Sequence, residues 1–412
     1  FCYNSFMYYN EREVSKHKNL KRIIVLLVLA FIFYVVFQLF RGWPKPQVEL
    51  TLKNQQIPGE FSLTWPGDIR YGVIGTLQGG IISRTPNQGQ WPLASVAKIM
   101  TAYIILKDHP LGIGQDGPTF TITQKEVNEY EAFKKDGQSV VKVALGEKLT
   151  ERQLLEGLMI PSANNFAYIL ARWDAGSVKA FVDKMNKTAQ SLGLKDTHYE
   201  DPAGANAGTV STPEDQFRLT QLAMQIPTFR HIVAMPQVNL PVAGVQYNVN
   251  YDLGKDNIVG VKTGSSLPAG ANFVFDSKQG NIDILGVIFG ASGKSPLISA
   301  LKDAITLIDA TKTQVSEQKL ISKNQQVGFI EVPWDKKRVP LLASQDFTTV
   351  VYPGMKISYS IVPIKDLKMP VKQGEVVANL IINYGDSSYS MPVVVSQEIR
   401  EPSFSDRLKR VL

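Results

Sequence analysis

The sequence predicts an α+β protein that is held to a membrane by an N-terminal transmembrane helix and ends in a small β-sandwich. Three patterns support this prediction. Residues 95–235 have mostly helical periodicity, residues 238–308 read as strands followed by one helix, and residues 328–397 are short alternating strands. An early strand pair, a helical block, more strands and a returning helix indicate a sheet with a helical insertion.

A continuous apolar segment lies near the N-terminal end. Residues 23–40 read IIVLLVLAFIFYVVFQLF, in which Gln38 is polar. As a helix this segment spans roughly 27 Å, close to the thickness of the hydrocarbon core of a bilayer. Four basic residues precede it, namely Lys16, Lys18, Lys21 and Arg22. We therefore expect a cytoplasmic N-terminus over residues 1–22, a single-pass anchor in the cell membrane over residues 23–40, and an extracytoplasmic remainder.

A cleaved signal peptide is the alternative interpretation of this segment. The apolar run is longer than a typical signal sequence, and Arg41-Gly42-Trp43-Pro44 follows it where a small-residue cleavage site would stand. An uncleaved anchor is therefore favoured. Cys2 is the only cysteine of the chain and would lie on the cytoplasmic side, so the outer part is expected to have no intrachain disulfide.

The net charge of +7 is concentrated beside this segment. Residues 1–46 contain seven Lys and Arg against two Glu, which leaves +2 for the remainder of the chain. A basic cluster next to a membrane explains such a distribution, and we expect no nucleic-acid partner.

Composition divides the outer part into five segments. Residues 41–58 are rich in proline and are predicted to be a spacer, and residues 313–327 are polar and are predicted to be a linker. Residues 59–312 lie between them and form the main domain. Residues 328–397 form the predicted β-sandwich, which has no cluster of catalytic residue types. Residues 398–412 are a tail, whose last ten residues have an apolar helical face that could touch a membrane, although a frayed end is favoured.

The helical block begins at Ser95. The stretch SVAKIMTAYIILKD over residues 95–108 carries an apolar stripe and stops before Pro110. Thr150 and Gln153 form a capping box for the next helix. The further helices are predicted by apolar periodicity and caps over residues 151–160, 165–174 and 178–192, with another that opens at Thr212 and Pro213.

Strands are predicted where β-formers are separated by Gly, Pro and Asn. A hairpin over residues 73–82 precedes the helical block, and residues 297–308 form an amphipathic helix that returns onto the sheet. The other strands of the main domain are predicted over residues 238–242, 246–251, 258–262, 272–276 and 282–289. The β-sandwich is predicted from strands over residues 347–351, 356–361, 376–383 and 389–395.

The histidines do not form a recognisable catalytic or metal-binding pattern. His17, His109, His198 and His231 lack metal-ligand spacing, and no Gly-x-Ser-x-Gly elbow is present. We therefore expect no metal site, and a structural or surface role for the three histidines outside the membrane.

A serine can also be activated by lysine, and Ser95 and Lys98 are separated by almost one helical turn. Their Oγ and Nζ atoms can therefore meet on one face of the helix. The helix N-terminus adds a positive dipole and a free N–H for an oxyanion. Lys98 can act as a base when burial and a second cation lower its pKa. Ser-x-x-Lys is weak evidence alone, because it also occurs at Ser15, Ser139, Ser299 and Ser316.

Two further motifs strengthen the prediction. Ser162-Ala163-Asn164 lies between two predicted helices, where the Ser162 hydroxyl can relay a proton and the Asn164 amide can hold a substrate backbone. A loop or capping serine is the ordinary alternative. Lys262-Thr263-Gly264-Ser265 ends the strand over residues 258–262, and Lys-Thr-Gly occurs once in the chain.

Each residue of this last motif has a possible role in the same chemistry. Lys262 supplies the second cation, the Thr263 hydroxyl can bind a carboxylate, and Gly264 lets a substrate approach the strand edge. The Ser265 N–H can complete an oxyanion hole with that of Ser95. A solvated lysine at a strand end is the alternative for Lys262, but the three motifs together are difficult to explain in that way.

With this three-part set, the chain resembles the serine-type D-Ala-D-Ala carboxypeptidases, the low-molecular-weight penicillin-binding proteins of the peptidase S11 family. Residues 328–397 resemble the C-terminal β-domain of that family. Further similar segments are residues 92–101, 136–139, 146–150, 159–164 and 211–215. The resemblance implies a β-lactamase/transpeptidase-like domain, with an antiparallel sheet flanked by helices and a helical subdomain, followed by the β-sandwich.

The resemblance also implies a substrate and a mechanism. The substrate is a peptidoglycan stem peptide ending in D-Ala-D-Ala, β-lactams are inhibitors, and neither a metal nor an organic cofactor is required. Lys98 takes the proton of Ser95, which attacks the carbonyl between the two D-alanines, and Ser162 passes a proton to the departing D-Ala. The implied catalytic residues are Ser95, Lys98 and Ser162, and the implied substrate-binding residues are Asn164, Lys262, Thr263, Gly264 and Ser265.

There are two departures from the family pattern and three alternative functions. Asp201-Pro202-Ala203-Gly204 stands where the family often carries Asn-Pro-His-Gly, and an N-terminal span replaces the frequent C-terminal amphipathic anchor. A β-lactamase of class A is disfavoured because neither Glu200 nor Glu214 precedes Leu-Asn. A non-catalytic penicillin-binding sensor is disfavoured by the intact motifs. A D,D-endopeptidase with the same residues remains open.

Overall fold

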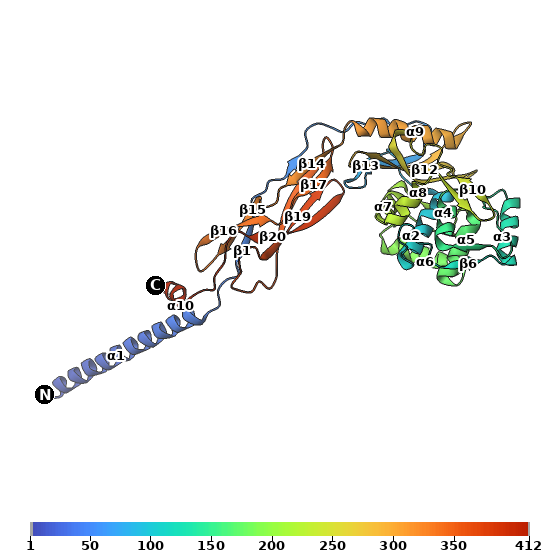
Figure 1. Cartoon of the computed structure of the whole chain (residues 1–412). Coiled ribbons are helices and arrows are strands. Elements are labelled where there is room, and N and C mark those ends of the chain that lie inside the picture. The colour runs from blue at the N-terminus through green and yellow to red at the C-terminus, as the bar shows by residue number, and fades with distance from the viewer. Residues whose placement is uncertain (1–2, 411–412) are drawn as a thin grey trace.

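The computed structural model describes residues 3–410. Helix α1 (Tyr3–Phe40) includes the predicted apolar segment, and its stretch from Lys16 to Phe40 is long and apolar enough to cross a membrane, a property that a signal sequence near an N-terminus shares. Large apolar side chains from Ile23 to Phe33 are exposed along this helix, as lipid contact requires. Cys2 lies outside the described residues. Figure 1 places α1 at one end of the molecule, a β-domain in the middle and the main domain at the far end.

The main domain is built on a five-stranded antiparallel sheet with the strand order β11-β12-β13-β3-β4. Helix α9 (Pro296–Lys312) covers one face, and the helical subdomain covers the other (Figure 1). The α+β prediction is therefore confirmed. The strands are β3 (Tyr71–Thr76), β4 (Gly80–Arg84), β11 (Ile258–Ser266), β12 (Gly270–Gln279) and β13 (Ile282–Ala291).

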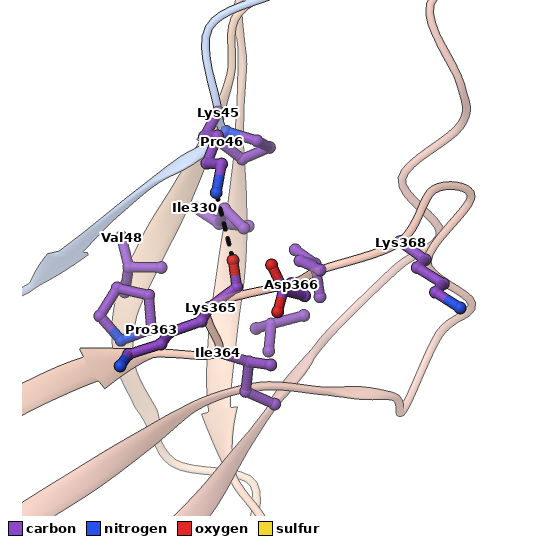
Figure 2. A pocket seen from close by; sticks show the side chains of 11 residues that line it. Lys45, Pro46, Val48, Ile330, Pro363, Ile364, Lys365, Asp366 and Lys368 are labelled. Carbon is purple, nitrogen blue, oxygen red and sulfur yellow. Dashed lines mark hydrogen bonds between the residues drawn. The ribbon is translucent and has the colours of Figure 1, made fainter.

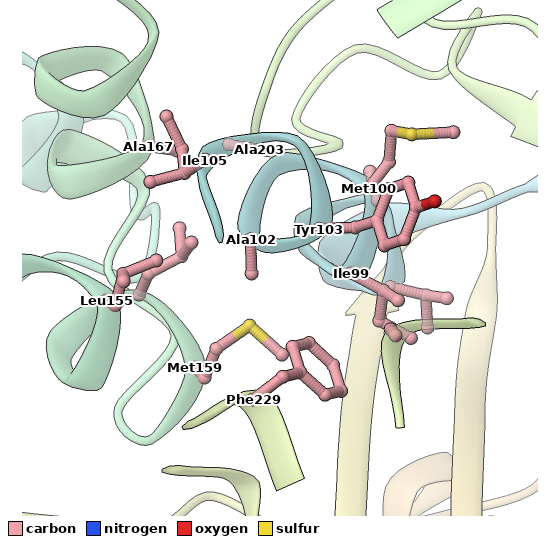
Figure 3. Close-up of a cluster of buried hydrophobic side chains, with 14 of the residues drawn as sticks. Ile99, Met100, Ala102, Tyr103, Ile105, Leu155, Met159, Ala167, Ala203 and Phe229 are labelled. Carbon is pink, nitrogen blue, oxygen red and sulfur yellow. The ribbon is translucent and has the colours of Figure 1, made fainter. Parts of the chain in front are cut away.

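The helical subdomain surrounds α2 (Lys98–Asp108), in which every residue from Lys98 to Leu106 is buried. Figure 3 shows its side chains, among them Ile99 and Ile105, packed against residues of the neighbouring helices such as Leu155 and Phe229. A helix this enclosed holds its N-terminal residues in a fixed place. The other helices are α3 (Gln124–Lys135), α4 (Glu151–Met159), α5 (Asn164–Ala175), α6 (Val178–Ser191), α7 (Pro213–Ala223) and α8 (Pro227–Val233).

Most helix starts were predictable from capping residues. The Thr150 hydroxyl accepts from the Gln153 N–H, while the Gln153 side chain accepts from the Thr150 N–H, which confirms the predicted capping box. Sequence reasoning missed α3, although Thr123 and Glu126 form the same kind of box at its start. The helix predicted from Ser95 differs at its first turn. Residues Ala94–Ala97 form the 3₁₀ turn η1, and α2 begins only at Lys98.

Short two-stranded pairs complete the main domain. They are β5 (Trp91–Pro92) with β8 (Val210–Ser211), β6 (Thr119–Thr121) with β7 (Lys148–Thr150), and β9 (Gln237–Leu240) with β10 (Gly244–Tyr247). The first pair leads directly into η1. It therefore ties the segment before Ser95 to the segment before α7.

The C-terminal domain contains two sheets that share one hydrophobic core. The larger sheet has the strand order β1-β15-β16-β20-β19-β18-β2, and the smaller pairs β14 with β17. Its strands are β1 (Gln47–Leu50), β2 (Gln55–Gln56), β14 (Ser316–Ile321), β15 (Gln326–Val332), β16 (Lys337–Ala343), β17 (Phe347–Val351), β18 (Lys356–Pro363), β19 (Val376–Tyr384) and β20 (Ser387–Val395).

Two predicted connections are wrong, because both contain strands of this domain. Within the expected spacer 41–58, β1 pairs with β15 and β2 pairs with β18. Within the expected linker 313–327, β14 pairs with β17, and Gln326 already begins β15. These strands are short, and β14 exposes its first four residues. Backbone pairing with a neighbour holds them in the sheet, and such pairing leaves no apolar pattern in the sequence.

The expected frayed tail also contains structure. Helix α10 (Phe404–Lys409) begins with a capping box between Ser403 and Asp406 and contacts the end of α1. The Arg407 guanidinium donates to the Leu39 carbonyl at 3.0 Å, and the Arg410 guanidinium lies 4.8 Å from the Trp43 ring centroid. The C-terminal helix α10 therefore meets the C-terminal end of α1, where α1 joins the β-domain, whereas the N-terminal end of α1 lies far from it (Figure 1).

A buried carboxylate lies on the helical face of the main sheet. Asp276 on β12 is fully inaccessible, and both its oxygens lack a hydrogen-bond partner among the described residues. Burial raises the pKa of Asp276 to about 8, and the Asp283 charge adds to this rise, while Arg230 and Lys278 oppose it. The folded protein therefore retains a proton that the unfolded chain releases.

Asp276 should make the protein less stable as pH rises. Its unfolded pKa is near the ordinary value of 3.8, so stability is lost between about pH 4 and pH 8. In this pH range the free energy of unfolding should fall by up to about 1.4 kcal/mol per pH unit because of Asp276, and Asp276→Asn should abolish that contribution. Chemical denaturation at several pH values measures the slope, with the exposed Asp366→Asn as control. Parallel curves for Asp276→Asn and wild type would contradict this assignment.

Candidate active site

The turn that carries Ser95 is fastened to the main sheet by one buried amide. Asn272 on β12 donates from Nδ2 to the carbonyls of Pro92 (2.8 Å) and Leu93 (3.0 Å), and its Oδ1 accepts from the Gly290 N–H at 2.9 Å. Asn272 is completely buried. Sequence reasoning missed it, although an asparagine inside an apolar central strand is a usable signal. These bonds place Ser95 beside the edge strand β11.

Lys98 is buried directly beneath Ser95. Its Nζ lies 2.7 Å from Ser95 Oγ, 2.6 Å from Asn164 Oδ1 and 3.1 Å from the Ala203 carbonyl oxygen. Burial lowers the pKa of Lys98 well below the ordinary lysine value, and the neighbouring Lys262 charge lowers it further, while Asp201 opposes the change. The predicted pairing of Ser95 with Lys98 is thus present, with a lysine that deprotonates easily.

The predicted Ser162 and Asn164 lie in the junction between α4 and α5. Ser162 has a φ of 67°, is 3% exposed, and its hydroxyl has no partner among the described residues. Holding a non-glycine residue in this conformation costs about 1–3 kcal/mol and is common at functional sites. Asn164 joins the two sides of the site, because its Oδ1 accepts from Lys98 and its Nδ2 donates to Gln138 at 2.7 Å. Its amide therefore positions the lysine in this structure.

The Lys262 motif forms the opposite wall. Lys262 is 1% exposed, its Nζ donates to the Thr263 carbonyl at 2.8 Å, and burial lowers its pKa to about 7. Thr263 is also buried, whereas Ser265 is exposed at the strand end. A Cβ at Gly264 would lie 2.9 Å from the Ser95 nitrogen and 3.0 Å from the Leu93 oxygen. Glycine is therefore needed here for β11 to pack against the serine turn.

The loop that departs from the family pattern supports Lys98 from below. Asp201 Oδ1 accepts from the N–H groups of Ala203 (2.8 Å), Gly204 (2.7 Å) and Ala205 (3.1 Å), and its Oδ2 accepts from the Asn206 N–H at 2.9 Å. This network aims the Ala203 carbonyl at Lys98. Gly204 has a φ of +79°, and a Cβ there would lie 1.8 Å from the Ala94 oxygen. Sequence reasoning noted the loop but assigned none of these contacts.

The fold therefore brings Ser95, Lys98 and Asn164 together by hydrogen bonds, packs Gly264 of the Lys262 motif against the serine turn, and places Ser162 in the junction beside Asn164. The histidines are elsewhere: His109 stacks on Trp173 and contacts Asp174 at 3.1 Å, and His198 and His231 are exposed. The described residues contain no group of three His, Cys, Asp or Glu side chains able to hold a metal. A separate hollow of about 770 Å³ lies in the β-domain and is lined by none of the predicted site residues. Lys45 lines it, and its Nζ donates to the Lys365 carbonyl (Figure 2).

Residues 72–293 match the family model of D-alanyl-D-alanine carboxypeptidases (peptidase S11), and residues 316–401 match the C-terminal domain of penicillin-binding protein 5. The chain belongs to the peptidase S11 family. The resemblance drawn from the motifs is thus confirmed for family, fold and enzyme class. The second match begins at β14, in agreement with the corrected domain boundary.

The curated relatives are named as D-alanyl-D-alanine carboxypeptidases or endopeptidases. A D-alanyl-D-alanine carboxypeptidase of Streptomyces strain K15 is 32% identical over 215 residues, covering 48% of this chain and 72% of the relative. DacD of Escherichia coli is 26% identical over 400 residues, covering 93% and 97%. A D-alanyl-D-alanine endopeptidase of Pseudomonas aeruginosa is 27% identical over 278 residues, covering 66% and 83%. Both enzyme names therefore occur among relatives of similar identity.

Solved structures agree with the fold. The Streptomyces K15 DD-transpeptidase superposes with a TM-score of 0.54 at 27% identity, covering 60% of this chain and 98% of its own. Penicillin-binding protein 5 of Haemophilus influenzae superposes with a TM-score of 0.65 at 21% identity, covering 82% and 100%. The likeness to penicillin-binding protein 5 extends beyond the main domain. At 21% identity it supports the fold and nothing further.

Gly264→Ala should impair catalysis more than folding. The new methyl group would press on three backbone atoms of the serine turn, all within 3.0 Å, and displace Ser95 from Lys98. Small displacements of a reacting group can lower rates by about 10²-fold. We expect kcat/KM for D-Ala release to fall at least about tenfold. Gly67→Ala, where nothing lies within 4 Å of the added carbon, is the matched control. Equal kcat/KM for both variants would contradict the packing argument.

Proposed function

We propose that the chain removes the terminal D-Ala from peptidoglycan stem peptides through an acyl-enzyme on Ser95. The observation that carries this proposal is the position of Lys98 Nζ, which is fully buried and lies 2.7 Å from Ser95 Oγ. A serine hydroxyl is a weak nucleophile unless a base takes its proton. A lysine whose pKa is lowered by burial and by a second cation supplies such a base.

In the acylation step, the neutral Lys98 amine accepts the Ser95 proton as Oγ bonds to the carbonyl carbon between the two D-alanines. The developing oxyanion is stabilised by the N–H groups of Ser95 and Ser265. The close packing of Gly264, the residue before Ser265, against the Ser95 nitrogen supports this role. The substrate carboxylate binds near Lys262 and Thr263.

The departing D-Ala needs a proton on its nitrogen. The Ser162 hydroxyl is buried and unpartnered among the described residues, so it is free to pass that proton from the lysines to the leaving amine. Water then attacks the ester, and Lys98 takes a proton from that water. The bond between Ser95 Oγ and the acyl carbon breaks, Lys98 returns its proton to Oγ, and the shortened stem peptide leaves. β-Lactams present a similar amide and therefore acylate the same serine as inhibitors.

Cleavage of D-Ala-containing cross-links by the same residues is the second candidate. The 27% identity to the Pseudomonas aeruginosa endopeptidase supports this second activity as a candidate. An endopeptidase requires room for a second peptide on the leaving-group side, whereas a carboxypeptidase requires a free carboxylate there. Lys262 and Thr263 offer an amine and a hydroxyl that could bind that carboxylate, so the carboxypeptidase is our main proposal.

We also propose that α1 holds the enzyme in the cell membrane with its N-terminus in the cytoplasm. The four basic residues before the apolar stretch support this orientation. The β-domain lies between α1 and the catalytic domain (Figure 1), and none of the eight proposed site residues belongs to it. Its role would then be that of a spacer between the membrane and the wall. Arg84 of the main domain contacts Asp386 of the β-domain at 2.8 Å and also pairs with Glu214 of its own domain.

The direct test is release of D-Ala from a peptide ending in D-Ala-D-Ala by the purified full-length protein. Ser95→Ala should reduce kcat by about 10³-fold or more, as removal of a catalytic serine does in other enzymes. Ser316→Ala is a matched control, since Ser316 opens another Ser-x-x-Lys sequence in strand β14, far from the cleft. Undiminished release by Ser95→Ala would contradict the assignment of the nucleophile. A cross-linked dimer assayed in parallel separates the two candidate activities.

A further inference from the structure

The hollow of about 770 Å³ in the β-domain lies at the end of that domain that adjoins α1 (Figure 1). It is formed by β1 with the segment before it, by β15, and by the connection between β18 and β19. Two contacts fasten this region to the chain that leaves α1. The Lys45 Nζ donates to the Lys365 carbonyl at 3.3 Å, and the Trp43 ring packs against that of Trp334 with 6.1 Å between centroids.

The position of Lys45 in the chain limits the distance between the hollow and a bilayer. Helix α1 ends at Phe40, five residues before Lys45. An extended chain spans at most about 3.6 Å per residue, so Lys45 lies within about 18 Å of the helix end. Lipid headgroups occupy roughly 5–8 Å beyond the hydrocarbon core, and their charges act over about a further 10 Å in 0.1 M salt. The hollow is therefore within reach of the headgroup layer.

Basic residues gather at this end of the β-domain. Eight Lys and Arg against three Asp and Glu occur in the three segments that meet here, residues 41–46, 333–338 and 363–376. The turn at the opposite end of the domain, residues 384–387, contains Asp386 and no basic residue. The positive end of the domain is thus the one beside the anchor, where an anionic membrane surface would attract it.

Three lysines of the hollow are available to bind an anion. Lys45, Lys365 and Lys368 are exposed, and the salt bridges within the described β-domain use other basic side chains. Asp366 also lines the hollow, so three positive charges face one negative charge. Figure 2 shows Asp366 with Lys365 and Lys368 on either side of it. An ammonium group on a flexible stem is a common ligand of a phosphate.

Apolar side chains form the rest of the lining. Ile330 and Val377 are buried in its floor, whereas Ile364 is 39% exposed and the neighbouring Val362 is 51% exposed. A free anion would use only the lysines. A phospholipid joins a phosphate to acyl chains and therefore matches both the lysines and the exposed apolar residues. The chemistry of the hollow and its place beside the anchor thus favour a lipid.

We propose that this hollow binds the phosphate of an anionic phospholipid and holds the β-domain against the bilayer. The site goes beyond the proposed reaction and rests on the proposed anchoring by α1. Ile364 contacts the lipid below its phosphate, and the three lysines surround the phosphate itself. A domain attached by a single connection is free to swing, whereas a second attachment fixes its orientation. The catalytic domain, at the far end of the β-domain, is thereby held away from the membrane (Figure 1).

A polarity-sensitive fluorophore beside the hollow tests the site in the full-length protein. Val362→Cys is labelled with nitrobenzoxadiazole in a Cys2→Ser background, because Cys2 is the only native cysteine. The protein is placed in nanodiscs of phosphatidylcholine, either alone or with increasing amounts of phosphatidylglycerol. The emission should rise and shift to shorter wavelength as phosphatidylglycerol increases. The same probe at Ile113→Cys, on the main domain, should not respond.

Loss of the lysine charges should weaken this response. In Lys45→Gln/Lys365→Gln/Lys368→Gln, the equilibrium constant for docking on the anionic nanodisc should fall about fivefold for each charge removed. Asp366→Asn should strengthen docking, because it removes the negative charge that faces the lipid phosphate. The opposite signs of the two changes separate an electrostatic contact from a general disturbance of the domain.

Three exposed lysines of the main domain provide the matched control, since Lys125→Gln/Lys187→Gln/Lys195→Gln removes the same charge and should keep the wild-type response. Denaturation curves for each variant verify folding. A wild-type probe that ignores phosphatidylglycerol, or a response unchanged by loss of the three lysines of the hollow, would overturn the lipid site. A response to inorganic phosphate in phosphatidylcholine nanodiscs would assign the hollow to a free anion instead and overturn it too. Failure of the protein to co-purify with nanodiscs would overturn the anchoring by α1, and the lipid site with it.

Discussion

The burial of the Lys98 amine is the constraint on which the rest of the site depends. An ammonium group is strongly solvated, so enclosing it is costly unless oxygen atoms replace the water or the proton leaves. Ser95, Asn164 and Ala203 supply those oxygen atoms, each within 3.1 Å of Nζ. They come from the serine turn, from the start of α5 and from the Asp201 loop. The lysine therefore organises three segments that are distant in the chain.

Two glycines allow these segments to approach closely. The absence of a side chain at Gly264 lets the edge strand pack against the serine turn, and its absence at Gly204 lets the Asp201 loop pack against Ala94. Asn272 then ties the same turn to the sheet through two backbone carbonyls. Because a close-packed interior transmits small displacements, a single added methyl group at either glycine would reach the reacting atoms. The rigidity of the sheet and of the enclosed helix α2 is thus transferred to the nucleophile.

Local signals predicted much of this arrangement. Apolar periodicity and caps located α4 and α6 within a residue and the start of α7, and the three motifs identified residues that the fold brings together. The partners that hold the motifs were not predictable in this way. Asn272 binds backbone carbonyls about 180 positions away, and the local turn that Asp201 holds presents the Ala203 carbonyl to Lys98, which is 105 positions away. No spacing rule encodes such distant contacts. The strands β1 and β14 were missed for a related reason, since pairing with distant strands defines them.

The pH dependence of acylation by benzylpenicillin tests the central claim most directly, when mass spectrometry of the digested adduct identifies the modified residue. If buried Lys98 is the base, the adduct is on Ser95. The acylation rate then rises with pH through a pKa well below the ordinary lysine value of 10.5 and levels off above it. An adduct on another residue, or a rate that still increases through pH 10, would contradict the account.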